Sequence, residues 1–494
     1  MPPDNGHRGL LDSGGDKLLF TTPIREVLQK AVITAPAAAS IREAAGVMAR
    51  HRISSLVLVD GAGTPAGMVT DRDLRDKVAA QGRDVDTGVG GIMSTNLRCI
   101  EASQYCFEAV LKMIQENIHH LLVMDQGRLA GIITNHDLMM VQGTSPIAIV
   151  REIEVQSSIA GLVPAAEKVN RIIGLLAKEG ARASNIMRII TEINDRLVKK
   201  VLQITERALG PPPLPYCWIG FGSEGRQEQT FRTDQDNALV LADAASPQEA
   251  GAAAVYFETF SLAVRDALAL CGFPLCTGGY MAANPQWRQP LAVWKDLFSR
   301  WLSTPTPEAL LRSVIFFDFR PLAGEIALGA QLRAHLAAAL PGRDMFFKHL
   351  AEMTARLRPP LNLWKGFILE KTGTHKGMLN LKVKCLAPLI DIVRLFSLEK
   401  ALPQTGTLER LAALRPIHQT AADYGDELAQ AFEFLSLLRI RQQLAAIEVG
   451  TAPDNYINPY RLSMLERRLL REACEIISRV QDSIVKRYRP GTTM

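Results

Sequence analysis

The 494-residue chain has 47% hydrophobic and 22% charged residues, the balance of a globular protein of about three domains, and its seven cysteines lack the C-x-x-C spacing of a zinc site or disulfide framework. Its 56 basic and 51 acidic residues give a net charge of +5, spread along the chain, which does not predict a nucleic-acid-binding protein. Because no apolar run is long enough to span a membrane and residues 1–22 lack the order of a signal peptide, we expect a cytoplasmic protein with a flexible N-terminus and no membrane contact.

Two similar segments follow this N-terminus. Residues 48–74 align with residues 113–138, and each copy has the pattern strand, helix, strand, strand, helix. The apolar runs SLVLVD and HLLVMD are bounded by glycine-containing turns, which is typical of buried strands joined as hairpins. His119 and His120 replace two serines of the first copy and point to opposite faces of their strand, so we interpret them as packing or ligand-contact residues.

Each copy then has a short motif that runs from strand into helix, GMVTDRD in the first and GIITNHD in the second. A threonine caps a helix N-terminus three residues before an aspartate, and capping alone explains both residue types. The motif also resembles the CBS (cystathionine β-synthase) domain, whose G-h-h-T-x-x-D segment, where h is apolar, binds the ribose and phosphate of adenine nucleotides. The resemblance implies a homodimer and a site for an AMP- or ATP-type nucleotide made by Thr70, Arg72, Asp73, Thr134 and Asp137, with Arg72 on a phosphate.

Residues 146–209 carry apolar side chains at spacings of three and four, which predicts helices. Gly210 and the prolines after it end the last of these helices and force the chain to reach the next strand in an extended conformation. That strand, CWIGF, ends at Gly222 and Ser223, where glycine lets backbone N–H groups approach a phosphate closely. Arg226 is a candidate phosphate ligand, and Glu228 is a candidate for orienting it.

Two aspartates, Asp234 and Asp236, begin the next strand, whose period of two points both carboxylates to one face. Converging carboxylates suit Mg²⁺, which neutralises the charge of a transferred phosphoryl group. Asp-x-Asp alone is often a solvated strand start, and Gly-Ser alone is an ordinary loop. Their combination, followed by an apolar strand, favours a metal-dependent nucleotidyl-transfer site.

The sequence GSEGRQEQ followed by TDQDNALV resembles the motif of the nucleotidyltransferase superfamily. It resembles in particular the CBS-domain nucleotidyltransferase-like proteins of bacterial signalling. These proteins are similar to the uridylyltransferase that modifies the nitrogen-regulatory protein PII. The resemblance implies a nucleoside triphosphate as donor, Mg²⁺ as cofactor and a protein acceptor, PII-like or another regulator. Asp234 and Asp236 would then hold the metal, Gly222 and Ser223 would bind the triphosphate, and Arg226 would take part in catalysis.

One departure from the superfamily concerns a third carboxylate, which is usually placed on a later core strand. The strand expected over residues 273–281 contains none. Asp318 is the nearest substitute, although we favour a structural ion pair or hydrogen bond near Arg320 for it. The missing carboxylate supports an alternative, a catalytically silent regulatory protein that senses nucleotides. A nucleic-acid-tailing enzyme would need a basic groove that the sequence does not locate.

The last third of the chain has the dense apolar stripes of bundle helices, and by resemblance it is the substrate-binding bundle of such transferases. This region also contains the densest basic cluster of the chain. We favour a solvated loop and helix start for this cluster, and the alternative is a surface that faces the acceptor or the nucleotide phosphates. Its members are Lys371, His375, Lys376, Lys382 and Lys384.

These features predict an α/β and α protein of several domains. We expect a tandem CBS pair over residues 23–82 and 88–145, a helical linker over 146–215, a nucleotidyltransferase-like mixed α/β domain over 216–335 and a helical substrate-binding domain over 336–494.

Overall fold

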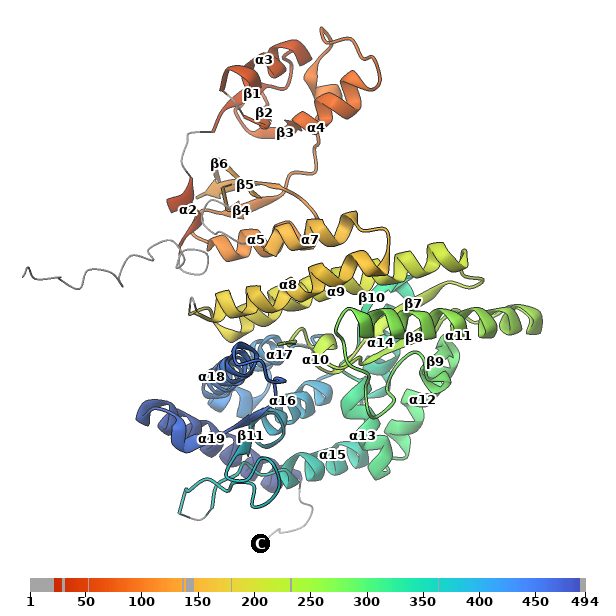
Figure 1. The fold of residues 1–494 in the computed structure, drawn as a ribbon, viewed down its shortest axis with the longest axis vertical. Helices are drawn as coiled ribbons and strands as arrows, with labels where there is room; N and C mark the ends of the chain where they lie inside the picture. The colour runs from red at the N-terminus through yellow and green to blue at the C-terminus, as the bar shows by residue number, and fades with distance from the viewer. Residues whose placement is uncertain are drawn as a thin grey trace, which may run out of the picture. The chain divides into compact units, whose positions relative to one another are not determined.

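The structure is a computed structural model that describes residues 22–28, 32–51, 53–135, 137–138, 146–178, 180–231, 233–362 and 364–488. The chain divides into two compact units, residues 1–151 and 152–494 (Figure 1). The segment expected to be flexible, residues 1–22, lies outside the described residues apart from Thr22, which is buried.

The first unit contains the predicted repeat as two three-stranded sheets of identical topology, β1-β2-β3 and β4-β5-β6. In each sheet the first strand is parallel to the second, and the second is antiparallel to the third. The elements are β1 (Thr34–Pro36), α3 (Ile41–His51), β2 (Ser55–Val59), β3 (Pro65–Thr70) and α4 (Asp71–Asp73) in the first copy, and β4 (Cys99–Glu101), α5 (Cys106–Glu116), β5 (His120–Asp125) and β6 (Arg128–Thr134) in the second.

Apolar spacing explains how each helix packs on its sheet. In α3 the buried residues are Ile41, Ala44 and Met48, which share one helix face and join a core with Leu56 and Leu58 of β2. The hydrophobic pattern that predicted strand and helix in the first copy is therefore the pattern that forms its core.

The segment that leads into each copy packs on the other copy. Helix α2 (Ile24–Val27) precedes the first copy, yet the Ile24 N–H donates to the Gln104 carbonyl at 2.8 Å. In the same way, the Ser94 N–H, which precedes the second sheet, donates to the Met68 carbonyl of β3 at 2.8 Å. This exchange ties the two copies into one module.

The second unit is built around a four-stranded sheet with the order β10-β7-β8-β9. Strand β7 is antiparallel to both neighbours, and β8 is parallel to the short edge strand β9. Every residue of β7 and β8 is buried, as expected for central strands covered on both faces. The strands are β7 (Tyr216–Gly220), β8 (Asn237–Leu241), β9 (Arg288–Pro290) and β10 (Arg320–Gly324).

Helices surround this sheet and continue to the end of the described chain. The helices expected before the sheet are α8 (Ile159–Lys178) and α9 (Ala183–Leu209), which lie side by side (Figure 1) after a shorter helix, α7 (Pro146–Val155). Helices α12 and α14 pack against the sheet. The others near it are α10 (Gly222–Gly225), α11 (Pro247–Leu270), α12 (Leu291–Ser303), α13 (Pro307–Phe316) and α14 (Ile326–Ala339).

The predicted C-terminal helical region is present. Helices α15, α16, α18 and α19 pack on one another, and α18 also contacts α9. A short π-helix, η4 (Lys382–Leu386), leads directly into α16. The elements are α15 (Asp344–Arg356), β11 (Leu379–Asn380), α16 (Ala387–Glu399), α17 (Thr407–Leu414), α18 (Gln419–Glu448), β12 (Tyr456–Ile457) and α19 (Met464–Tyr488).

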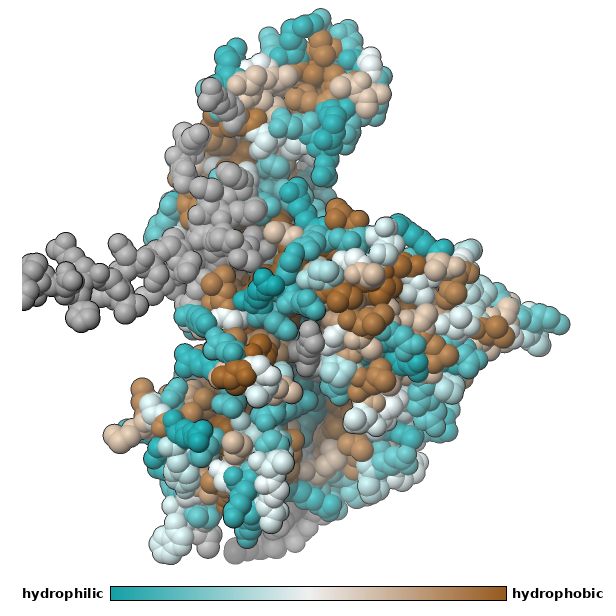
Figure 2. All heavy atoms as spheres, in the orientation of Figure 1, coloured by the Kyte–Doolittle hydropathy of each residue, from teal (hydrophilic) through white to brown (hydrophobic). Residues whose placement is uncertain are grey.

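Hydrophilic and hydrophobic side chains are interspersed over the face of the protein drawn in Figure 2, as is normal for globular surfaces. In the part of the chain that the structure describes, no helix combines the length and the apolar character that crossing a membrane requires.

Candidate functional site

A sharp turn after β7 contains two glycines, Gly222 and Gly225, at the start of the candidate site of the second unit. Gly222 has a φ of 58°, and a Cβ there would lie 2.9 Å from the Asp236 Oδ2 atom. A Cβ on Gly225 would lie 1.9 Å from the Asp318 carbonyl oxygen. Glycine is therefore needed at both positions, because helix α10 is wedged between the Asp236 carboxylate and the backbone that leads into β10.

The two predicted aspartates converge, and a cysteine joins them. Ligand atoms of Asp234, Asp236 and Cys276 all lie within 4.8 Å of one another. Asp234 is exposed, whereas Asp236 and Cys276 are half-buried. Burial, helped by the charge of Asp234, raises the pKa of Asp236 to about 7, and burial also raises the pKa of the Cys276 thiol. The cluster is thus a compact acidic site at the start of β8.

The residues that alternate with the aspartates hold the cysteine loop in place. The Gln235 amide donates to the Phe273 carbonyl at 3.0 Å, and the Asn237 side chain accepts from the Ala282 N–H at 2.9 Å. Because successive side chains of an extended segment point to opposite sides, Gln235 and Asn237 anchor residues 273–282 while Asp234 and Asp236 face the site.

Sequence reasoning missed Cys276, although it lies in the segment searched for a third carboxylate. The prediction of a strand over residues 273–281 is wrong, because these residues form turns and irregular structure. The edge strand β9 begins later, at Arg288. The available signal was the position itself, because a thiol stands in the segment where a carboxylate was sought.

Arg226 is held by two carboxylates behind the turn. Its Nε atom donates to Glu228 Oε2 at 2.7 Å, and its Nη1 atom donates to Asp318 Oδ2 at 3.0 Å. The expected contact of Glu228 with Arg226 is present. Both acids fix the guanidinium beside Ser223, with which it lines a cavity of about 120 Å³.

Asp318 makes the expected structural ion pair, but with other partners. Its fully buried carboxylate is 2.7 Å from Arg394, 2.8 Å from Arg410 and 3.0 Å from Arg226. Burial alone would raise the pKa of Asp318, yet these arginines hold it well below its usual range. Arg320 pairs instead with Asp195 at 2.7 Å. Asp318 is therefore a junction between the sheet and the C-terminal helices, apart from the aspartate cluster.

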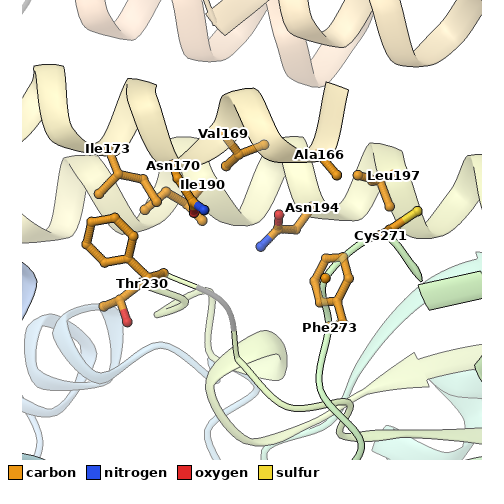
Figure 3. Close-up of a pocket in the computed structure, with 12 residues that line it drawn as sticks. Ala166, Val169, Asn170, Ile173, Ile190, Asn194, Leu197, Thr230, Cys271 and Phe273 are labelled. Atoms are coloured by element: carbon orange, nitrogen blue, oxygen red, sulfur yellow. The ribbon is translucent and has the colours of Figure 1, made fainter. Parts of the chain in front are cut away.

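A small pocket behind the motif has a structural role. Side chains of α8 and α9 form one wall, and Thr230 and Phe273 lie on the other (Figure 3). Its volume of about 20 Å³ holds roughly one water molecule. On this wall the Asn194 amide donates to the Gln229 side chain at 3.2 Å, which ties Gln229 to α9.

The buried acid of α10, Glu224, gives a pH-dependent prediction. Burial, with Asp195 adding and Arg320 opposing, raises its pKa from 4.5 to about 8. The unfolded chain then binds fewer protons at this group than the folded protein between these values, so the contribution of Glu224 to the free energy of unfolding falls as pH rises through that window, by up to about 5 kcal/mol. We expect Glu224→Gln to make this fall smaller and to leave the part that comes from the raised pKa of Asp236, as measured by urea unfolding at several pH values.

The control for this measurement is Glu258→Gln on the exposed face of α11, which should keep the fall. All five tryptophans lie between residues 218 and 364, so their fluorescence reports the 152–494 unit. An unchanged pH dependence in Glu224→Gln would assign the fall to other groups.

In the first unit both threonine motifs form capping boxes. The Thr70 hydroxyl donates to Asp73 Oδ2 at 2.6 Å, and the Asp73 N–H donates to the Thr70 hydroxyl at 3.3 Å. Thr134 and Asp137 repeat the arrangement at 2.6 and 3.2 Å. The capping interpretation is thus confirmed for both copies.

Residues of both motifs act electrostatically on one histidine. Burial and His119 lower the pKa of His120, and the charges of Asp137, Arg72 and Asp73 act on it as well. Arg72 and Asp73 of the first copy and Asp137 of the second are therefore within electrostatic reach of the same imidazole, although they are about sixty residues apart in the sequence.

Comparisons with known proteins agree with this architecture. The CBS domain model matches residues 24–80 and 89–143, the model described as putative nucleotidyltransferase DUF294 matches 167–308, and the model described as putative nucleotidyltransferase substrate binding domain matches 344–488.

Related proteins match about a quarter of this chain. The CBS domain-containing protein YhcV of Bacillus subtilis is 34% identical over 119 residues, which cover 24% of this chain and 84% of YhcV. An uncharacterized protein of Methanopyrus kandleri is 36% identical over 121 residues, covering 24% of this chain and 62% of that protein. A solved CBS domain protein from Pyrobaculum aerophilum, complexed with AMP, is 27% identical and covers 23% of this chain and 88% of its own, with a TM-score of 0.23. The chain belongs to the CBS-domain proteins, and its CBS pair is joined to a DUF294 nucleotidyltransferase region and to the substrate-binding domain of that family.

Proposed function

We propose that the protein is a Mg²⁺-dependent nucleotidyltransferase, similar to PII uridylyltransferase, whose CBS pair responds to adenine nucleotides. The convergence of Asp234 and Asp236 beside the Gly222 turn carries this proposal. The proposed acceptor is a protein, PII-like or another regulator, and the proposed setting is a homodimer in the cytoplasm.

The donor atoms of the cluster fit Mg²⁺ through the two carboxylates. Mg²⁺ prefers hard oxygen ligands and usually binds one or two carboxylates together with substrate phosphates. A thiol is a softer ligand, so Cys276 would lie beside the ion as a neutral neighbour. Asp234 and Asp236 would hold the ion, which supplies charge neutralisation for the phosphates when it is bound.

The remaining residues of the motif position the substrates. Gly222 and Ser223 would offer first-turn N–H groups of α10, which have no intrahelical acceptor, to the triphosphate. Arg226, fixed by Glu228 and Asp318, would hold a phosphate oxygen from the same cavity. An acceptor oxygen then bonds to the α-phosphorus while the bond to the β-phosphate oxygen breaks and pyrophosphate leaves, so the protein contributes mainly positioning and electrostatics.

The test is transfer of label to a protein. The protein is incubated with Mg²⁺, each labelled nucleoside triphosphate and a cell extract. We expect Asp234→Asn and Asp236→Asn to lower transfer at least about 100-fold, since several kcal/mol of transition-state stabilisation depend on the metal site. Asp266→Asn, which removes an exposed carboxylate of α11, should keep full activity. Equal labelling by wild type and both site variants would exclude this site.

A catalytically silent regulatory protein is the second candidate. The observation that favours it is the third position of the cluster, where the described residues place a thiol instead of a carboxylate. This candidate predicts that nucleotide binds at the Gly222–Asp236 motif and that no label is transferred from any of the nucleoside triphosphates.

The sensor proposal rests on the Thr–Asp pair present in both motifs and on the electrostatic reach of both copies to His120. We expect Thr70→Ala and Asp137→Ala to weaken AMP or ATP binding about tenfold, the worth of one hydrogen bond to a charged group, as measured by calorimetry. Thr70→Ala also removes a helix cap, so Ser40→Ala, which breaks the Ser40–Glu43 capping box elsewhere in this unit, is the matched control. Unchanged nucleotide affinity in both motif variants would overturn the assignment.

A further inference from the structure

A cavity of about 120 Å³ lies between the transferase motif and the C-terminal helices. Ser223 and Arg226 line it from the motif side, while Lys382 of η4 and Arg439 of α18 line it from the helical region. Lys382 belongs to the basic cluster that stands out in the sequence, and it is the member of that cluster that lines this cavity.

The charges of the cavity do not balance. Its lining includes four basic and two acidic side chains: Arg226, Lys382, Arg394, Arg439, Glu228 and Asp391. Both acids are already occupied, because Glu228 pairs with Arg226 and Asp391 pairs with Arg394. Two cations of the cavity, Lys382 and Arg439, are therefore left without an acid of the cavity wall.

Arg439 is a buried cation whose hydrogen-bond partner among the described residues is a neutral amide. Its side chain is 9% exposed, and its Nε atom donates to the Asn455 Oδ1 atom at 2.6 Å. Within the described chain no carboxylate forms an ion pair with Arg439 or with Lys382 at 4.0 Å or less. Since an unpaired charge is costly to bury, the arrangement is that of a site that receives an anion.

The pKa values of the two cations are consistent with an anion site. Burial, with Arg226 adding, lowers the pKa of Arg439 to about 10. Burial, with Arg439 adding, lowers the pKa of Lys382, although part of this residue is exposed to solvent. Asp234 acts on both cations in the opposite direction. The two cations thus lie within electrostatic reach of the aspartate cluster.

We propose that Lys382 and Arg439 bind the terminal phosphates of the nucleoside triphosphate donor, so that the C-terminal helical region completes the nucleotide site. This inference rests on the proposed function for the identity of the ligand, whereas the anion site itself rests on the cavity. Ser223 and Arg226 meet the same phosphates from the other wall, and the aspartate cluster lies next to them.

The direct test uses tripolyphosphate and the full-length protein in calorimetry at low salt. We expect Lys382→Ala and Arg439→Ala to weaken binding roughly ten- to a hundred-fold, the worth of a charge-assisted hydrogen bond. Lys384→Ala, two residues along η4, and Arg441→Ala, two residues along α18 and paired with Glu466, are the matched controls and should bind as wild type does. No binding by wild type, or equal binding by all four variants, would overturn the proposal.

Two further measurements keep the outcomes distinct. Arg439→Lys retains the charge if Arg439→Ala unfolds, as judged by tryptophan fluorescence, and Lys382→Ala alters a solvent-accessible side chain that the fold does not need. In the label-transfer assay, loss of transfer in Asp236→Asn with unchanged tripolyphosphate binding in Lys382→Ala refutes this inference alone. Tripolyphosphate binding that depends on Lys382 without any label transfer refutes the transferase function and keeps the anion site.

Discussion

Asp318→Asn is expected to destabilise the 152–494 unit by about 3–5 kcal/mol, because removing one partner of a buried ion pair leaves the other charges uncompensated. The carboxylate is fully buried and lies within 3.0 Å of three arginines, which come from the motif, from α16 and from α17: Arg226, Arg394 and Arg410. Asparagine keeps the shape of the side chain but cannot neutralise them. Urea unfolding followed by tryptophan fluorescence measures the loss.

The control for this prediction is an exposed pair in the same unit. Asp426 lies 2.7 Å from Arg415 with more than half of its side chain exposed, so Asp426→Asn should cost about 1 kcal/mol or less. A loss of similar size in Asp318→Asn would mean that solvent or neighbouring groups compensate the three arginines. Because Asp318 also fixes Arg226, we expect its variant to lower nucleotidyl transfer even at temperatures where the protein stays folded.

The aspartate cluster shows which parts of a site a sequence reveals. Asp234 and Asp236 are two residues apart, so the strand period alone predicted that their carboxylates share a face. Cys276 is forty residues further on, in a loop held by Gln235 and Asn237, and no local period connects it with the aspartates. Local geometry is encoded in spacing, whereas the third member depends on tertiary hydrogen bonds.

The same limit applies to the charges. An ion pair or hydrogen bond was the favoured role of Asp318 because Arg320 lies two residues away. Its partners Arg394 and Arg410 lie on helices that no pattern near Asp318 identifies. Arg320 was the obvious partner, but Asp318 lies in the turn before β10, whereas Arg320 begins that strand and pairs with Asp195 of α9. Proximity in sequence is therefore a poor guide to ion-pair partners.

The repeat was predictable as a fold but not in its connections. Alternating apolar runs and turn residues gave the order of strands and helices in each copy. The sequence did not predict that the segment before each sheet packs on the other copy. The two segments resemble each other, so the sequence alone does not say which copy each one contacts. Internal similarity therefore predicts the units and leaves their pairing undetermined.

Gly222→Ala is expected to lower nucleotidyl transfer and Mg²⁺ affinity at least about tenfold, well beyond its effect on stability. Residue 222 has a φ of 58°, a conformation that costs a non-glycine residue about 1–2 kcal/mol. In addition, the new methyl group would lie 2.9 Å from the Asp236 Oδ2 atom, closer than van der Waals contact allows, so the carboxylate must shift from its position in the cluster. Transfer assays and metal titrations report this displacement directly.

The matched control is Gly342→Ala, which has a φ of 76° and no atom within 4 Å of the added methyl group. Both variants should lose similar stability, because they share the backbone strain, while only Gly222→Ala disturbs a carboxylate. Equal transfer activity in the two variants would show that Asp236 tolerates the shift and does not hold the ion. Comparison of the pair thus separates the strain of a left-handed residue from the position of the carboxylate, which is the quantity on which the proposed metal site depends.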